Sequence, residues 1–310
     1  MAGTLATLLA VLLWSFHAAA GELSVREVSP LQLTLQSYLL SMLFLGLWSF
    51  CRKPSTLRCL QDLGWGLILA LVVSGPVLML YYLALYAGMS LAPAVDVYII
   101  HYLWPIFAAL FVKLFLGRSW GVNDALTWIL MLLAFMGAGM IVLGGSGQGP
   151  GSGSLHGYIL AFISAVSGGL YLPALVLAGD RLCSRGYPEY MGFMIPYLLL
   201  IAGGMAAIAL FMLFFDLQLD LGNASSWAGA AFIGLGVIVL AEMAWVFGVR
   251  WNRSQSTTAL AYLTPVFSTS LLVFVTGQQL VSSTAYGLAL VVTANMFLHL
   301  HSAKVQSWKG

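Results

Sequence analysis

The stretch Tyr98-Ile-Ile-His101-Tyr-Leu-Trp104-Pro105-Ile-Phe107 places a histidine, two tyrosines, a tryptophan and a proline inside an apolar run. Part of it recurs 160 residues later, because Tyr102-Leu-x-Pro105-x-Phe107 matches Tyr262-Leu-x-Pro265-x-Phe267. Upstream, Ala84-x-x-x-Gly88 recurs as Ala244-x-x-x-Gly248 at the same spacing. Four identities in six residues, with a second match in register, predict a duplicated unit with this stretch and its copy at the centre.

The composition places this duplicated unit in a membrane. Of the 310 residues, 61% are hydrophobic and only 7% are charged, whereas a soluble domain has about 25% charged residues. The apolar residues fall into segments of about 20, the length that crosses a hydrocarbon core. The sequence therefore predicts an all-α polytopic membrane protein.

We predict ten membrane spans. The first could instead be a signal peptide, because Ala18-Ala-Ala20-Gly21 resembles a cleavage site. It lacks the basic segment that precedes such peptides, and its removal would break the repeat, so we keep it as a membrane helix. The spans cover residues 3–20, 31–50, 64–88, 93–115, 122–143, 156–178, 189–214, 226–248, 256–276 and 283–301.

The basic residues alternate with these spans. Eleven of the twelve Lys and Arg residues follow an even-numbered span, and only Arg26 lies on the other side. The positive-inside rule then predicts that both termini are cytoplasmic. Because each half has an odd number of spans, the second half enters the membrane from the opposite side. The expected fold is two inverted five-helix repeats around a central cavity, as in many secondary transporters; a duplicated scaffold without transport is the alternative.

The two halves are joined by a Gly/Ser-rich segment without charge, which is typical of a flexible tether. We therefore divide the chain into a first repeat at 1–143, an extracytoplasmic linker at 144–154 and a second repeat at 155–310. Cys51, Cys59 and Cys183 all fall on the cytoplasmic side, so we expect free thiols. The sequence shows no zinc spacing, and we expect no metal and no cofactor.

Polar and aromatic side chains deep in a span usually face a cavity or a partner helix. On span four, Tyr98, His101, Trp104 and Pro105 share one helical face. On span three, Gly75, Met79 and Tyr82 do the same, and Gly75-Pro76 is expected to bend the helix. We predict that these two faces line the cavity, with Gly75, Pro76, Pro105 and Pro265 as hinges.

The 160-residue spacing predicts which residues of the second half correspond to these two faces. Tyr82 corresponds to Glu242 and Trp104 to Thr264, with Trp245 and Ser268 close by. Spans one and six correspond in the repeat, and His17 and Tyr171 lie toward their ends. Trp14, one turn before His17, is also expected to face inward. The candidate substrate-binding residues are Trp14, Met79, Tyr82, Tyr98, His101, Trp104, Tyr171, Glu242, Trp245, Thr264 and Ser268.

Each of these residues also has a structural interpretation. Aromatic residues often form belts at the membrane interfaces, and Tyr81 and Tyr86 fit such a belt better than a cavity. His101 can instead hydrogen-bond a neighbouring helix. Glu242 can bind a proton or an ammonium group, or it can extend toward Arg250. Asp96 lies near the outer end of its span, where solvation is easy, so we expect a minor role.

No Lys or Arg lies deep in any span, so a phosphorylated or dianionic substrate would lack a counter-charge. A cavity of rings with few charges suits a flat, largely apolar solute, neutral or zwitterionic, and ring faces also attract cations. The chain has no HExxH motif and no paired aspartates on facing spans, so we expect no enzyme. A receptor or intramembrane enzyme remains the alternative class, and solute flux in proteoliposomes distinguishes it.

Five plus five spans, with Pro105 and Pro265 in matching register, resemble the drug/metabolite transporter superfamily of the EamA type. Tyr102-Leu-Trp104-Pro105, Tyr262-Leu-Thr-Pro265-Val, Ala244-Trp245 and Leu13-Trp14-Ser15 are similar to the bacterial aromatic amino acid exporters of the YddG type. His101 departs from that type, which puts its role in doubt.

The resemblance implies export of Phe, Tyr and Trp, and of aromatic cations such as paraquat, without ATP. It also implies a basket of helices around a central cavity in the bacterial inner membrane. The expected partners are a small-molecule substrate and the lipid bilayer, with no nucleic acid and no obligate protein partner.

Overall fold

The computed structural model describes residues 2–117, 124–144, 154–215, 222–251 and 263–307, and these residues form helices without a strand. The first half contains α1 (Ala2–Val25), α2 (Pro30–Cys51), α3 (Lys53–Met89), α4 (Ala94–His101), α5 (Trp104–Leu116) and α6 (Asp124–Gly144). The second half contains α7 (Leu155–Leu170), α8 (Leu172–Ser184), α9 (Glu189–Phe214), α10 (Ala224–Ala231), the π-helix η1 (Phe232–Ala241), α11 (Glu242–Trp251), α13 (Thr264–Thr276) and α14 (Ser282–Ser307).

Seven helical stretches among these residues are long and apolar enough to cross a membrane. Trp128–Gly144 and Thr264–Thr276 are apolar but shorter. The multi-pass character is thus confirmed, while the count of ten spans stays a prediction. Most of the linker, at 145–153, also lies outside the described residues.

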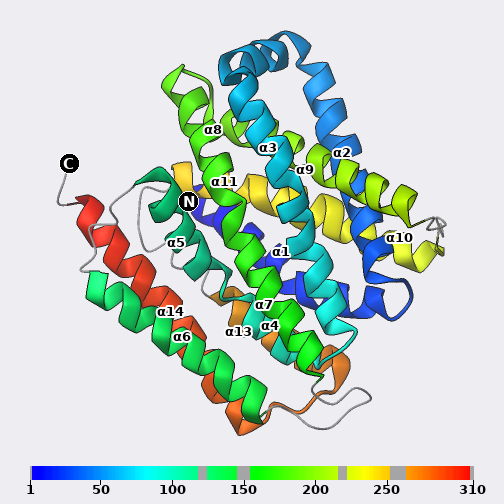
Figure 1. Cartoon of the computed structure of the whole chain (residues 1–310), viewed down its shortest axis with the longest axis vertical. Coiled ribbons are helices and arrows are strands. Elements are labelled where there is room, and N and C mark those ends of the chain that lie inside the picture. The colour runs from blue at the N-terminus through cyan, green and yellow to red at the C-terminus, as the bar shows by residue number, and fades with distance from the viewer. Residues whose placement is uncertain (1, 118–123, 145–153, 216–221, 252–262, 308–310) are drawn as a thin grey trace.

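The helices pack in a pattern that is the same when the two halves are exchanged. α1 packs against η1, α11 and α13 of the second half, whereas α7 packs against α3, α4 and α5 of the first. The contact between α2 and η1 corresponds to the contact between α9 and α3. α6 lies beside α14 (Figure 1). The central helices therefore come from both halves, with α6 and α14 forming a pair at one side.

Small residues set two of these contacts in the same way. A Cβ atom added to Gly88 of α3 would lie 3.1 Å from the carbonyl oxygen of Gly157 of α7. A Cβ atom added to Gly248 of α11 would lie 3.1 Å from the carbonyl oxygen of Gly3 of α1. Small side chains allow close approach of helices in a membrane, where packing is the main attractive force. The Ala-x-x-x-Gly pair found in the sequence thus marks two equivalent helix crossings.

The π-helix η1 adds one residue to the second half. Gly75 of α3 packs on Gly204 of α9, while Gly234 of η1 packs on Ser37 of α2. These two glycines are 159 residues apart, whereas Gly88 and Gly248 are 160 apart. A π-helix holds more residues per turn than an α-helix, so it accommodates a single extra residue without displacing its neighbours. The extra residue lies between Gly234 and the start of α11.

The repeated proline marks the start of a helix in each half. α4 ends at His101, and α5 begins at Trp104 with Pro105 in its first turn. Pro265 has the same place in α13, since a first-turn proline removes only an N–H that would be unpaired anyway. Within α3, the residue that departs from helical geometry is Gly64, at a φ of 75°.

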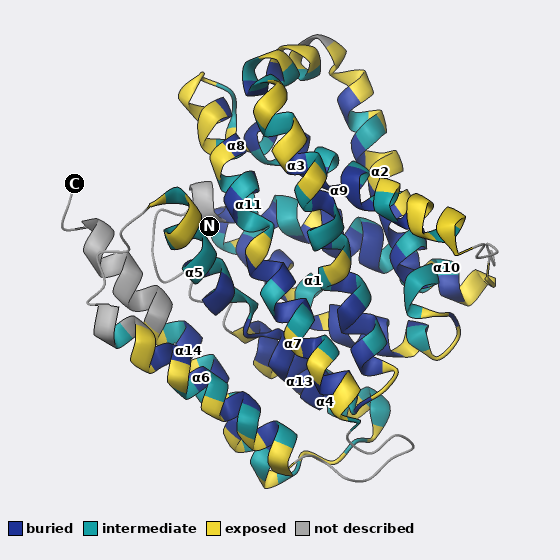
Figure 2. Cartoon of the chain, viewed as in Figure 1, coloured by how far each residue is buried: buried dark blue, intermediate teal, exposed yellow. Residues whose placement is uncertain are grey.

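Burial follows the arrangement expected in lipid. Buried residues concentrate on the crossing faces of the central helices (Figure 2). Large apolar side chains cover the outward faces, among them Leu47, Trp65 and Phe274. An exterior of this kind is stable against hydrocarbon tails, and the polar groups are gathered inside.

Candidate functional site

A cavity of about 640 Å³ lies between the two halves. Its volume is in the range of sites that enclose a drug-sized ligand. The side chains around it come from α1, α3, α4, α5, α8, α9, η1 and α11. The aromatic and titratable members are Trp14, His17, Tyr81, Tyr82, Tyr98, His101, Tyr102, Trp104, Tyr171, Asp180, Glu189, Phe193, Glu242 and Trp245.

The first half supplies a continuous wall of rings. Tyr81 lies 4.8 Å from Tyr82 and 4.7 Å from His101, measured between ring centroids. His101 lies 5.5 Å from Tyr98, which lies 5.5 Å from Tyr102. Ring pairs at these separations stabilise one another beyond their buried area. The wall therefore presents ring faces and edges in fixed orientations.

The opposite wall combines an indole pair with a carboxylate. Trp14 of α1 and Trp245 of α11 lie 5.5 Å apart between ring centroids. Glu242, the first residue of α11, lines the cavity one turn before Trp245, together with Tyr81 and Tyr82 of α3. The carboxylate thus lies among phenols, and no Lys or Arg is present in the described cavity lining.

Three hydrogen bonds hold the polar groups of these walls. Tyr86 pairs with Nε2 of His17 at 2.9 Å. The Tyr98 hydroxyl donates to the Trp14 carbonyl oxygen at 3.2 Å. His101 pairs through Nδ1 with the Ser164 hydroxyl at 2.8 Å, which joins α4 to α7. Buried polar groups with such partners keep their positions.

The structure brings together most of the residues singled out in the sequence. Those that line the cavity are Trp14, Tyr82, Tyr98, His101, Trp104, Pro105, Tyr171, Glu242 and Trp245. Those that lie elsewhere are Gly75, Pro76, Met79, Thr264, Pro265 and Ser268. The hinge assignments and the binding roles stay predictions.

The residues outside the lining have structural surroundings. Met79 packs against Gly204 of α9. Ser268 donates to the Thr264 carbonyl oxygen, one turn earlier in α13. The Thr264 hydroxyl is buried and has no hydrogen-bond partner among the described residues. Gly75 is the point of closest approach between α3 and α9, so its small size serves packing.

The sequence reasoning placed two tyrosines wrongly. Tyr81 and Tyr86 were expected in an interfacial belt, but Tyr81 lines the cavity and Tyr86 is fully buried against His17. Both tyrosines do lie near a helix end, because α3 ends at Met89, one residue beyond the predicted span. Their rings nevertheless point into the helix bundle and not toward the membrane interface. Tyr102 was also missed as a lining residue, although it stands in the repeated motif.

One end of the cavity reaches the surface. Asp180, Cys183 and Glu189 line that end and are exposed. Next to it, Asp62 of α3 forms an ion pair with Arg185 and accepts a hydrogen bond from Tyr187 at 2.7 Å. The bond to Asp62 raises the pKa of Tyr187 to about 12. These contacts fix α3 to the α8–α9 connection at the mouth.

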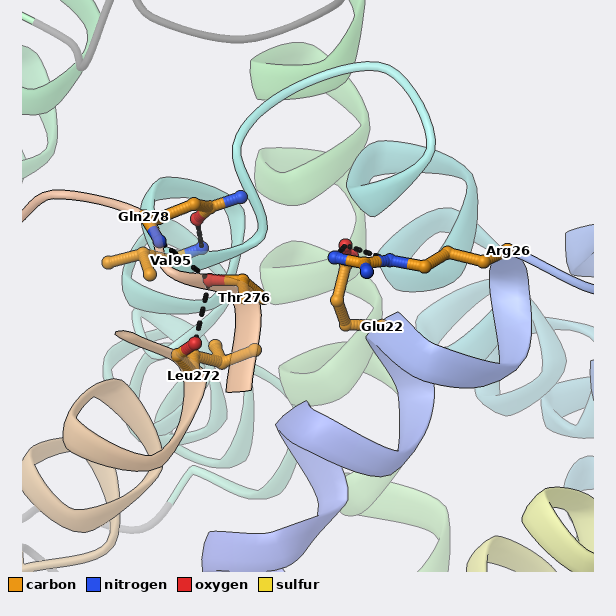
Figure 3. Close-up of polar contacts among 6 residues, drawn as sticks. All are labelled: Glu22, Arg26, Val95, Leu272, Thr276 and Gln278. Carbon is orange, nitrogen blue, oxygen red and sulfur yellow. Dashed lines mark hydrogen bonds and ion pairs between the residues drawn. The ribbon is translucent and has the colours of Figure 1, made fainter. Parts of the chain in front are cut away.

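The other end is closed by contacts between the halves. The backbone N–H of Val95 donates to Oε1 of Gln278 at 3.3 Å, and Gln278 in turn donates to Thr276 (Figure 3). Asp96 is fully buried, against expectation, and accepts hydrogen bonds from Tyr158 and Thr284 at 3.1 and 2.8 Å. Among the described residues, the exposed part of the cavity lining therefore lies at the end formed by Asp180, Cys183 and Glu189.

A comparison with known protein families finds a match over the first half of the chain. Residues 1–143 match the model of the EamA-like transporter family. A solved crystal structure, described simply as that of a protein, is 23% identical over 94% of each chain, with a TM-score of 0.57. At this identity the likeness concerns the fold alone. No curated protein gives a significant match.

Proposed function

We propose that this chain is a secondary transporter that exports aromatic amino acids, and aromatic cations such as paraquat, across the bacterial inner membrane. The coarser assignment, a small-molecule transporter, is supported by the EamA-like domain at 1–143. The substrate class is our inference from the cavity. The observation that carries it is a 640 Å³ space lined by rings, with Glu242 and without Lys or Arg among its described residues.

Rings recognise rings through offset and edge-to-face contacts. By this proposal, Tyr82, Tyr98 and Trp104 contact the substrate ring and His101 contacts its polar end. The absence of Lys and Arg from the described lining also supports this substrate class, because a sugar phosphate would find no counter-charge there. The runner-up is a transporter of another small neutral or zwitterionic metabolite in the same superfamily.

We infer that transport proceeds by alternating access between two inverted five-helix repeats. The exchange symmetry of the helix contacts supports this arrangement. The mouth lies beside Arg181 and Arg185, so the positive-inside rule assigns it to the cytoplasm. The conformation would then be inward-open, and rocking of one half against the other would exchange the open end.

The direct test is transport of labelled phenylalanine by the purified protein in proteoliposomes. Tyr82→Ala, Trp104→Ala and His101→Ala should each reduce flux at matched expression. Trp65→Ala is a control, because this indole is 86% exposed and faces outward. If all three cavity variants transport like the parent, the cavity assignment is wrong.

A competition panel distinguishes the proposed aromatic exporter from the runner-up, a transporter of another small metabolite. Unlabelled phenylalanine, tyrosine, tryptophan, aliphatic amino acids, an aromatic cation and a sugar phosphate are offered against the labelled solute. Competition by the ring compounds alone supports the proposal, and competition by aliphatic amino acids of equal potency supports the runner-up.

Glu242 offers a test of energy coupling. If its carboxylate carries the coupling proton, Glu242→Gln should abolish the response to a pH gradient and leave downhill flux. A uniporter would show the same flux with and without the gradient in both proteins.

A further inference from the structure

His101 ends α4 beside the break before α5, and its ring is buried against α7. Its neighbours are Tyr81 and Tyr98, which lie on either side in the ring wall. Its one recorded side-chain hydrogen bond joins Nδ1 to the hydroxyl of Ser164. The direction of this bond determines what the other ring nitrogen offers to the cavity.

The Ser164 hydroxyl fixes that direction. It has one hydrogen, and it donates that hydrogen to the backbone carbonyl oxygen of Tyr81. A carbonyl oxygen accepts only, so the serine oxygen can meet Nδ1 of His101 only as an acceptor. Nδ1 must therefore carry the proton. In the neutral ring, Nε2 is then an unprotonated acceptor.

The surroundings favour the neutral ring. No carboxylate is hydrogen-bonded to His101 among the described residues, and a buried imidazolium without such a partner is costly. No described residue is recorded as a donor to Nε2, and His101 belongs to the cavity lining. The lone pair of Nε2 is thus left for a bound solute.

Other acceptors in this part of the wall already have donors. The Trp14 carbonyl oxygen accepts from Tyr98, and the Tyr81 carbonyl oxygen accepts from Ser164. Besides the phenol oxygens of the wall, His101 Nε2 and the Glu242 carboxylate can receive a hydrogen from the solute. Both accept hydrogen bonds, and neither a Lys nor an Arg lines the described cavity to hold an acidic group.

We propose that His101 Nε2 accepts a hydrogen bond from an N–H group of the solute, with Ser164 as the positioning residue that sets the tautomer. This inference rests on the proposed transport of aromatic solutes and specifies their chemistry further: an amine or ring N–H close to the aromatic ring. Ser164 belongs to the second half and His101 to the first, so the recognition group is assembled from both.

The tautomer of His101 can be tested by a measurement that does not depend on transport. Protein labelled with ¹⁵N-histidine is reconstituted in lipid, and the ring nitrogens are observed by NMR, with His101→Phe to assign the signal. We expect Nδ1 of His101 to be protonated and Nε2 to be bare in the parent. Ser164→Thr, which keeps the hydroxyl, should preserve this state, and Ser164→Ala should allow both tautomers. A parent signal with the proton on Nε2 would overturn the proposal.

The recognition step is tested by a matched pair of competitors, phenethylamine and phenethyltrimethylammonium. Both carry a ring and a positive charge, but only the first has N–H donors. The parent should prefer phenethylamine by about tenfold, the value of one hydrogen bond to a charged group. His101→Phe should lose this preference and keep competition by both compounds.

The outcomes separate this inference from the proposed function. If neither compound nor any aromatic solute competes, the proposed function fails while the tautomer result stands by itself. If both compete equally in the parent, the transport proposal survives and the role of Nε2 is refuted. If Ser164→Ala does not fold, the NMR state of the parent and the Ser164→Thr selectivity still decide.

Discussion

Alanine substitutions at two adjacent glycines of α7 should separate an effect on stability from an effect on transport. Gly168 faces the ring of Tyr81 and the Cβ atom of Trp104, whereas Gly169 faces the backbone of Phe107 and Ala108 in α5. A methyl group at either position is too close to its neighbours. The difference is what must move, because a side chain beside a cavity yields and a helix backbone does not.

The structure gives the size of each perturbation. The Cβ atom of Gly168→Ala would lie 2.6 Å from the Tyr81 ring and 2.9 Å from the Cβ atom of Trp104. To reach 3.4 Å, the ring must move about 0.8 Å and the first turn of α5 about 0.5 Å, whereas Gly169→Ala meets the α5 backbone itself at 2.4 Å. The ring shift costs about 0.5–1.5 kcal/mol of rotamer strain, offset by the better helix propensity of alanine. Gly169→Ala instead forces α7 away from α5, and overpacking of this kind costs about 1–3 kcal/mol.

The assay combines thermal unfolding in detergent with phenylalanine flux in proteoliposomes. Gly168→Ala should melt near the parent but transport poorly, because Tyr81 is pushed toward Tyr82 and His101. Gly169→Ala should melt at a clearly lower temperature. Gly139→Ala in α6 is the control, since nothing lies within 4 Å of its added methyl group. Equal melting of the two α7 variants would refute the packing argument, and parental flux in Gly168→Ala would refute a role for Tyr81.

Three further predictions follow from other parts of the molecule. Asp96→Ala should lower the melting temperature, because it removes the acceptor of the Tyr158 and Thr284 hydroxyls. Each hydroxyl left without a partner costs about 1–3 kcal/mol of stability. In a double-mutant cycle, Asp96→Ala should cost less in the Tyr158→Phe background, and additive effects would contradict the network. Deletion of Val237 should convert η1 to an α-helix and keep the protein folded, as measured by circular dichroism and melting; a loss of folding would show that the extra residue is not absorbed there. Cys183, exposed at the mouth, should react with a maleimide faster than buried Cys59, and a transported solute should slow that reaction; protection of neither or both thiols would place the mouth elsewhere.

The sequence allowed the central elements to be predicted because their signals are local. Helices in lipid must satisfy their own backbone groups, so each apolar segment of sufficient length becomes one. The recurrence around Pro105 and Pro265 then indicated which helices correspond. Tyr98, His101 and Trp104 follow one another at helical spacing in span four, and they line the cavity together with Tyr82 of span three.

The residue placements that differ from the structure depend on contacts between segments that are distant in the sequence. Asp96 was placed near solvent because of its position in the span, yet Tyr158 and Thr284 enclose it from the second half. Thr264 and Ser268 were assigned to the cavity by a fixed 160-residue spacing from span four. That spacing transfers a position along a helix, but not the direction in which the helix faces its neighbours.

The π-helix η1 bears on how the two halves are compared. A single spacing of 160 pairs Gly88 with Gly248 correctly, but it pairs Gly75 with Leu235 rather than with Gly234. An alignment of the first half with the second that allows no gap therefore loses its register inside this helix and underestimates the sequence similarity of the halves. Placing a one-residue gap between 234 and 242 pairs both glycines, and under the proposed duplication this gap is where the two halves differ in length.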